Sequence, residues 1–122
     1  MAYALNWESD GVVIEFRGLV SIRDLEQATV GYEADSRFDD LHWVIADYSG
    51  IDGCDAHPAE IESVWVMDFG ARRSNPRVRK VVVTTRPEVL AMASHYASHL
   101  GGAFEVKSVA TRAEARAWLA QA

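Results

Sequence analysis

The chain has 122 residues, of which 49% are hydrophobic and 25% charged, an ordinary composition for one globular domain. No apolar run approaches the roughly 20 residues of a membrane-spanning helix, and the opening "MAYALNWESD" lacks the pattern of a secretory signal. Cys54 is the only cysteine, which excludes an internal disulfide and fits a reducing compartment. We therefore expect a single domain over residues 1–122 that is cytoplasmic and not transmembrane.

The net charge of −6 is divided unevenly along the chain. Residues 1–62 carry 14 acidic and 3 basic side chains, whereas residues 63–122 carry 4 acidic and 9 basic ones, giving net charges of −11 and +5. The overall acidity argues against nucleic-acid binding, which requires many phosphate contacts. Five basic residues lie close together and are interpreted as solvated surface, with an acidic partner or an anionic membrane surface as alternatives: Arg72, Arg73, Arg77, Arg79 and Lys80.

The amino-terminal part predicts a strand hairpin followed by a helix. Residues 3–7 alternate Tyr, Leu and Trp with Ala and Asn, and after the turn signal Asp10-Gly11 the apolar Val12, Ile14 and Phe16 share one face of a second strand. The two strands should pair antiparallel. Ser21 with Asp24 three residues later is typical of a capping box at the start of a helix. The inward positions of this helix follow at helical spacing: Ile22, Leu25, Ala28 or Thr29, and Tyr32.

A buried strand and a longer helix come next. The apolar middle of "LHWVIADY" (41–48) predicts a strand that is buried on both faces. Pro58 suits the first position of a helix over 58–74, because its missing N–H would be unsatisfied there anyway. The predicted buried stripe of this helix consists of Ile61, Val64, Trp65 and Phe69. Val66 and Met67 are also apolar, so either the helix is deeply buried or a second face meets a ligand, a partner subunit or lipid.

Two further strand–helix pairs complete the chain. "VRKVVVTT" (78–85) is rich in β-branched residues and predicts a fourth strand. A helix over 87–100 begins at Pro87 and is closed by Gly101-Gly102. Its predicted inward residues are Val89, Ala93, Tyr96 and Leu100. Residues 103–109 form the fifth strand, and Thr111 with Glu114 starts a last helix that docks through Ala115, Trp118 and Leu119.

The predicted element order is ββαβαβαβα. Successive strand–helix–strand crossovers require parallel strands with right-handed connections, whereas the initial hairpin adds one antiparallel strand. We therefore predict an α/β domain with a five-stranded mixed sheet and four helices. Functional groups in such sheets usually gather at the carboxyl ends of the strands. The segments "DYSGIDGCDAHP" (47–58) and "TTRP" (84–87) both follow strand ends.

Both the element order and two segments of the chain resemble the STAS domain. The stretch "WVIADYSGIDGCDAHP" has that family's apolar strand, Asp, short loop, second Asp and helix, and "TRAEARAWLAQ" is similar to the last helix of the SpoIIAA-like branch, also called STAS/SEC14-like. The resemblance covers almost the whole chain. It implies a non-catalytic module that binds a protein or a small ligand.

The same resemblance implies the loss of a phosphorylation switch. In phospho-regulated STAS proteins a Ser or Thr follows the second Asp, and its phosphorylation releases a partner. Matching Asp55 to that Asp puts Ala56 where the hydroxyl would be. Ser49 precedes Asp55 and is expected to support the turn. We therefore expect a module without the usual phosphoacceptor.

The loop residues Cys54, Asp55 and His57 also allow a catalytic or metal-binding interpretation. A Cys/His pair needs an activated thiolate and a group that orients the imidazole, and the sequence shows no recognised nucleophile motif. In the structural alternative, Asp52 or Asp55 accepts backbone N–H bonds and His57 caps the following helix. Ligand recognition by the loop is a third possibility.

His95 and His99 are four residues apart, a spacing known from metal sites on helices. The sequence predicts that they share a solvated face with Glu88 and Met92, opposite Val89. "HYASH" lacks the glutamate of a zinc-protease motif. We expect no enzyme activity, no metal and no cofactor.

The predicted recognition surface combines the 48–57 loop, the 84–86 strand end and helix 58–74. Its site residues are Tyr48, Ser49, Asp55, His57, Trp65, Thr84, Thr85 and Arg86. The main hypothesis is binding of a protein partner or self-association. The alternatives are a sensor or carrier of a small apolar or lipid-like ligand, held between helices 58–74 and 87–100 or at an anionic membrane, and a hydrolase or metalloenzyme that uses His57 or the His95–His99 pair.

Overall fold

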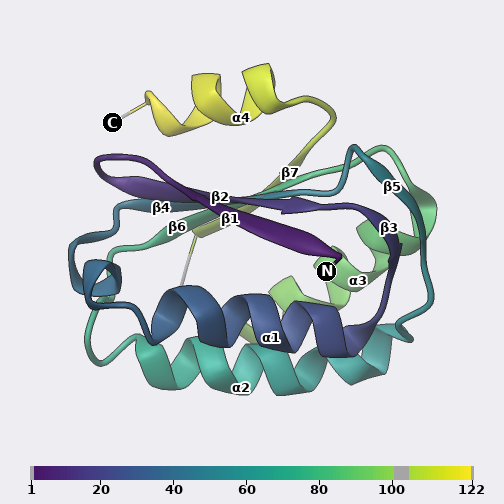
Figure 1. The fold of residues 1–122 in the computed structure, drawn as a ribbon, viewed down its shortest axis with the longest axis horizontal. Coiled ribbons are helices and arrows are strands. Elements are labelled where there is room, and N and C mark those ends of the chain that lie inside the picture. The colour runs from purple at the N-terminus through teal and green to yellow at the C-terminus, as the bar shows by residue number, and fades with distance from the viewer. Residues whose placement is uncertain (1, 101–104, 122) are drawn as a thin grey trace.

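The computed structural model describes residues 2–100 and 105–121, and its main feature is a five-stranded sheet in the order β1-β2-β4-β6-β7 (Figure 1). β1 pairs antiparallel with β2, and the other neighbouring strands pair parallel, which confirms the predicted mixed sheet. The strands are β1 (Tyr3–Trp7), β2 (Gly11–Phe16), β4 (Trp43–Asp47), β6 (Arg79–Val83) and β7 (Glu105–Val109).

Two short strands lie outside the predicted order. β3 (Gly18–Val20) pairs parallel with β5 (Ile51–Cys54) in a separate two-stranded sheet. Part of the segment 47–58, which the sequence predicted as a loop, is therefore a strand. Gly18 has a φ of 66°, a left-handed conformation that glycine adopts without strain and that turns the chain out of β2. Val20 and Ile51 are buried, so this small sheet is anchored in the core.

The helices lie on both faces of the large sheet. Figure 1 shows α1 and α2 together on one side and α4 on the other, and α3 packs into the same core as α1 and α2. Their bounds are α1 (Ile22–Glu33), α2 (Glu62–Ala71), α3 (Pro87–Leu100) and α4 (Arg112–Leu119). Two short 3-10 helices precede β4 and α2: η1 (Ser36–Asp40) and η2 (Pro58–Ile61).

Alternation along the central strands separates two cores. Val44 and Ala46 face α1, α2 and α3, whereas Trp43 and Ile45 face α4 together with Ala115. Every residue of β4 is buried, as the apolar pattern predicted. Trp118 and Leu119 pack partly buried against the second core, so the predicted docking of the last helix is confirmed.

Side chains cap the starts of the helices as predicted. Ser21 and Asp24 form a reciprocal capping box on α1, and Thr111 accepts a hydrogen bond from the Glu114 N–H at the start of α4. Leu25, Ala28, Thr29 and Tyr32 are buried on α1. Leu100's side chain, Gly101-Gly102 and the start of the strand predicted from Ala103 lie outside the described residues.

The orientation of α2 differs from the prediction. Ile61 and Val64 are buried as expected, but Phe69 is 43% exposed and Trp65 is only partly buried. The third inward position is the charged Asp68, which is 4% exposed because a lysine of β6 meets its carboxylate there. The prediction that this helix is deeply buried is therefore wrong, since the Val66 side chain is 54% exposed.

On α3, the inward residues Val89, Ala93 and Tyr96 are confirmed. Met92 is also buried, at 2% exposure, so its predicted position on a solvated face with the two histidines is wrong. The face that α3 buries between the sheet and η2 is wider than the predicted stripe.

Candidate functional site

The turn after β4 is held by Asp47, the last residue of that strand. Its Oδ1 accepts hydrogen bonds from the Ser49 backbone N–H at 2.9 Å and from the Ser49 hydroxyl at 2.6 Å. Burial raises the pKa of Asp47, but the hydrogen bonds from Ser49 and Arg112 outweigh it and hold that pKa below its usual value. Ser49 supports the turn as predicted, whereas the accepting carboxylate is Asp47 and not the exposed Asp52 or Asp55.

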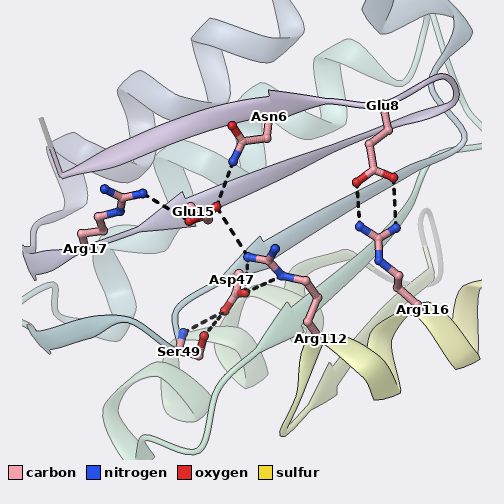
Figure 2. Close-up of polar contacts among 8 residues, drawn as sticks. All are labelled: Asn6, Glu8, Glu15, Arg17, Asp47, Ser49, Arg112 and Arg116. Atoms are coloured by element: carbon pink, nitrogen blue, oxygen red, sulfur yellow. Dashed lines mark hydrogen bonds and ion pairs between the residues drawn. The ribbon is translucent and has the colours of Figure 1, made fainter.

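Two arginines of α4 join this turn and the first hairpin, as Figure 2 shows. Arg112 contacts Asp47 and lies 3.7 Å from a carboxylate oxygen of Glu15. Arg116 pairs with both oxygens of Glu8, at 3.0 and 2.6 Å. These charges therefore attach α4 to the sheet, and their carboxylates are engaged within the chain.

Tyr48, the first residue after β4, packs into the core below the loop. Its ring is 6% exposed and stacks on Phe16 with centroids 4.5 Å apart. Tyr48 was predicted as a binding residue, but the structure places it in the core, because the residue after a buried strand end continues the inward alternation. The residues of the turn that face solvent are Ser49 and Gly50.

His57 caps the following helix, as the structural interpretation predicted. Its Nδ1 accepts the Ala59 N–H at 3.1 Å, and the Glu60 carboxylate accepts the His57 N–H at 2.6 Å. Burial raises the pKa of the Cys54 thiol, as do the charges of Asp55 and Glu88, and these effects outweigh the Ala56 backbone hydrogen bond and the Arg86 charge, which lower it. A thiol with a raised pKa and an imidazole engaged in capping do not form an activated nucleophile.

The 84–86 segment meets β5, which confirms that the two predicted segments lie together. The Thr84 hydroxyl is buried and accepts the Arg86 N–H at 3.0 Å, while Thr85 is exposed. The guanidinium of Arg86 donates to the Asp52 carbonyl and lies 3.5 Å from a carboxylate oxygen of Glu88. Arg86 thus joins the end of β6 to the small sheet.

An exposed surface forms where these segments meet. Leu19 is 64% exposed, and a Cβ placed on Gly53 would lie 3.4 Å from the Leu19 side chain and 3.8 Å from the Arg86 guanidinium. Asp52 in β5 and Asp55 just after it are also exposed. We call this surface the β3–β5 patch, and it consists of Leu19, Asp52, Gly53, Asp55 and Arg86. Leu19 was missed because its strand has only three residues.

Trp65 belongs to a different surface from Arg86. Its ring stacks on Phe69 at 5.3 Å and lies 5.6 Å from the His99 ring, at the opposite end of α3 from Arg86. Its indole N–H is buried and has no acceptor among the described residues. The eight predicted site residues therefore do not form one surface.

A buried ion pair lies beneath the helices and was not predicted. Lys80 was assigned to the solvated basic cluster, but its side chain is only 14% exposed and its Nζ lies 2.6 Å from Asp68 Oδ2. Hydroxyls of Tyr96 and Tyr32 also donate to the Asp68 carboxylate. Burial raises the pKa of Asp68, but the Lys80 charge and the hydrogen bonds from Glu33, Lys80 and Tyr96 together outweigh it and hold that pKa below its usual value.

Lys80 and Tyr96 line two small cavities between the sheet and the helices. The larger has a volume of about 50 Å³ and is lined mainly by apolar side chains of the sheet, α1 and α3. The smaller, of about 20 Å³, lies beside Tyr32 and Glu33.

Among residues 2–100 and 105–121, no group of three or more His, Cys, Asp or Glu side chains is arranged to hold a metal ion. Within the same residues, no helix has the length and apolar content needed to cross a bilayer.

Comparisons with known proteins agree with this architecture. A family model described as SpoIIAA-like matches residues 12–120. Curated proteins give no match. The chain is similar to the solved structure of the anti-sigma factor antagonist SpoIIAA in its unphosphorylated form, with a TM-score of 0.62 and 16% identity over 99% of this chain and 100% of that one.

It is also similar to a protein of the DUF3478 family with a SpoIIAA-like fold from Shewanella loihica PV-4. Here the TM-score is 0.54 and the identity 18%, over 97% of this chain and 92% of the other. At these identities the two solved structures show a shared fold.

Proposed function

The chain belongs to the SpoIIAA-like family, and on that premise we propose that it is a non-catalytic module that binds a protein partner through the β3–β5 patch. The observation that carries this proposal is the contact of Arg86 with the Asp52 carbonyl. It holds the Arg86 guanidinium against β5, where a Cβ on Gly53 would lie near both that guanidinium and the exposed apolar side chain of Leu19. Rigid apolar residues surrounded by polar ones are typical of protein interfaces.

Binding through this surface would not be controlled by phosphorylation of the loop. Ala56 stands at the position that resembles the phosphoacceptor of related modules, and it has no hydroxyl. The Ser49 hydroxyl is hydrogen-bonded to Asp47, where it stabilises the turn. The non-catalytic assignment is supported by Cys54 and His57, because the thiol pKa is raised and the imidazole caps a helix.

Matched surface variants test this proposal. Proteins captured from cell extract by the wild-type chain are quantified beside those captured by Leu19→Asp, and sedimentation velocity reports self-association. We expect Leu19→Asp to lose a partner or the self-association that Val66→Asp, at another exposed apolar site on α2, retains. The proposal fails if both variants capture the same proteins as the wild type and have the same sedimentation profile.

A second candidate function is binding of a small apolar ligand in the larger cavity. That cavity is lined by α1, η2, α3 and the sheet, near the position between helices 58–74 and 87–100 that this hypothesis requires. Its volume of about 50 Å³ is roughly a third of the cavity that accommodates benzene in an engineered protein. Only a ligand of a few atoms fits unless the helices separate, which makes this function secondary to partner binding. Native mass spectrometry of the purified protein tests it, and a spectrum of the unliganded chain alone would count against it.

A further inference from the structure

His95 and His99 place two imidazole nitrogens at the separation of metal ligands. They lie one turn apart on α3, and their Nε2 atoms are 3.1 Å apart. Two nitrogens that are each about 2.0–2.1 Å from one zinc ion, at angles between a right angle and a tetrahedral one, are separated by about 2.8–3.4 Å. A metal ion would therefore fit between them without a change of rotamer.

We propose that His95 and His99 form a two-imidazole site for a divalent transition-metal ion of the Zn²⁺, Ni²⁺ and Cu²⁺ class. Imidazole is a preferred ligand of these ions, whereas Mg²⁺ and Ca²⁺ prefer oxygen ligands. In the metal-free protein one Nε2–H donates to the other Nε2. Metal binding requires both Nε2 atoms to be unprotonated, with each remaining ring proton on Nδ1.

The surroundings favour an accessible and partly hydrated ion. His99 is exposed and His95 partly so, which leaves an open path from solvent. Since no third His, Cys, Asp or Glu joins them in the described part of the chain, water completes the coordination. The Trp65 ring packs 5.6 Å from the His99 ring and restricts its movement. The site lies at the far end of α3 from Arg86, so it is independent of the β3–β5 patch.

The test is a calorimetric titration of the purified chain with Ni²⁺ and Zn²⁺ chloride. We expect one ion per chain, and we expect His95→Gln and His99→Gln each to weaken binding by about tenfold or more, since each removes one of two protein ligands. His42→Gln is the matched control, because His42 is an exposed histidine outside α3 and should leave the affinity unchanged. Mg²⁺ should give no heat.

Indole fluorescence gives a second measurement that locates the ion. Ni²⁺ bound beside His99 should quench the fluorescence of Trp65, and Trp65→Phe should remove most of this quenching while the calorimetric affinity persists. Circular dichroism establishes that each variant is folded. Unchanged Ni²⁺ affinity in the His95→Gln/His99→Gln double variant, or an equal loss in His42→Gln, would overturn the proposal.

Discussion

Arg112 of α4 binds the Asp47 carboxylate at the end of β4 with two nitrogens. Its Nε and Nη2 lie 2.9 and 2.7 Å from the same oxygen, Oδ2, while the other carboxylate oxygen accepts both hydrogen bonds from Ser49. One carboxylate thus organises the turn after β4 and attaches the last helix. The loop geometry and the docking of α4 are therefore coupled.

Replacement of this carboxylate should lower stability. Asp47 is buried while the Arg112 side chain is 41% exposed, so Asp47→Asn should reduce the free energy of unfolding by about 1–3 kcal/mol, below the cost of breaking a fully buried pair. Urea denaturation measures this change. Arg17→Gln removes the surface ion pair between Arg17, whose side chain is 68% exposed, and Glu15. This control substitution should change the free energy of unfolding by less than about 0.5 kcal/mol. Equal effects of the two substitutions would contradict the coupling described here.

The same carboxylate should contribute to acid denaturation. Because the pKa of Asp47 in the folded protein lies below its usual value, its contribution is present above that usual value and is lost as the pH falls through the folded pKa. Unfolding curves of the wild type and Asp47→Asn should therefore converge at acidic pH. A difference between them that stays constant below pH about 3 would show that the substitution acts through packing alone.

The buried Asp68–Lys80 pair should be more sensitive to substitution. Asp68→Asn leaves the Lys80 ammonium buried without a counter-charge, so we expect a loss of about 3–5 kcal/mol. The double variant Asp68→Leu/Lys80→Met removes both charges and should recover much of that loss, because it no longer buries an unpaired ion. Thermal and urea unfolding measure both. If the double variant were as unstable as Asp68→Asn, packing and not charge pairing would be the main contribution.

The sequence predicted the large sheet well because its signals are local. The apolar residues at every second position from Val12 to Phe16 and the apolar run in 43–47 each indicate a strand without knowledge of its neighbours. The capping residues Ser21 and Thr111 likewise mark helix starts, since the bonds that they accept come from the next turn.

Features that depend on distant contacts were not predictable in this way. β5 forms because β3 pairs with it across roughly thirty residues of chain. Asp68 faces inward because Lys80 meets it, and neither residue alone indicates burial. For the site, the proximity of "TTRP" to the 47–58 segment followed from topology, whereas the position of Leu19 beside Arg86 did not.

Cys54 should react slowly with thiol reagents. Burial and the nearby charges of Asp55 and Glu88 raise its pKa, which reduces the thiolate population at neutral pH. We expect the native chain to react with an aromatic disulfide reagent more slowly than the same chain unfolded in urea, where the thiol is free. Faster reaction of the native protein would reveal an activated thiolate and would contradict the non-catalytic assignment.

Glu33 should make the protein less stable as the pH rises. Burial, with the adjacent Asp68 carboxylate, raises the pKa of Glu33 to about 9. A group whose pKa is raised by folding contributes stability that is fully present below its unfolded pKa, and this contribution is lost progressively as the pH rises towards the folded value. Relative to Glu33→Gln, the wild type should therefore lose stability between pH about 5 and 9.

Urea unfolding at several pH values within that interval measures the difference between the two proteins. Glu62→Gln, at an exposed position on α2, serves as the control and should follow the wild type throughout. Because glutamine cannot ionise beside Asp68, the Glu33→Gln variant should be the more stable protein at the alkaline end of the interval. Parallel curves for the wild type and Glu33→Gln would mean that Glu33 is already ionised at neutral pH and that the Asp68–Lys80 pair tolerates a second carboxylate.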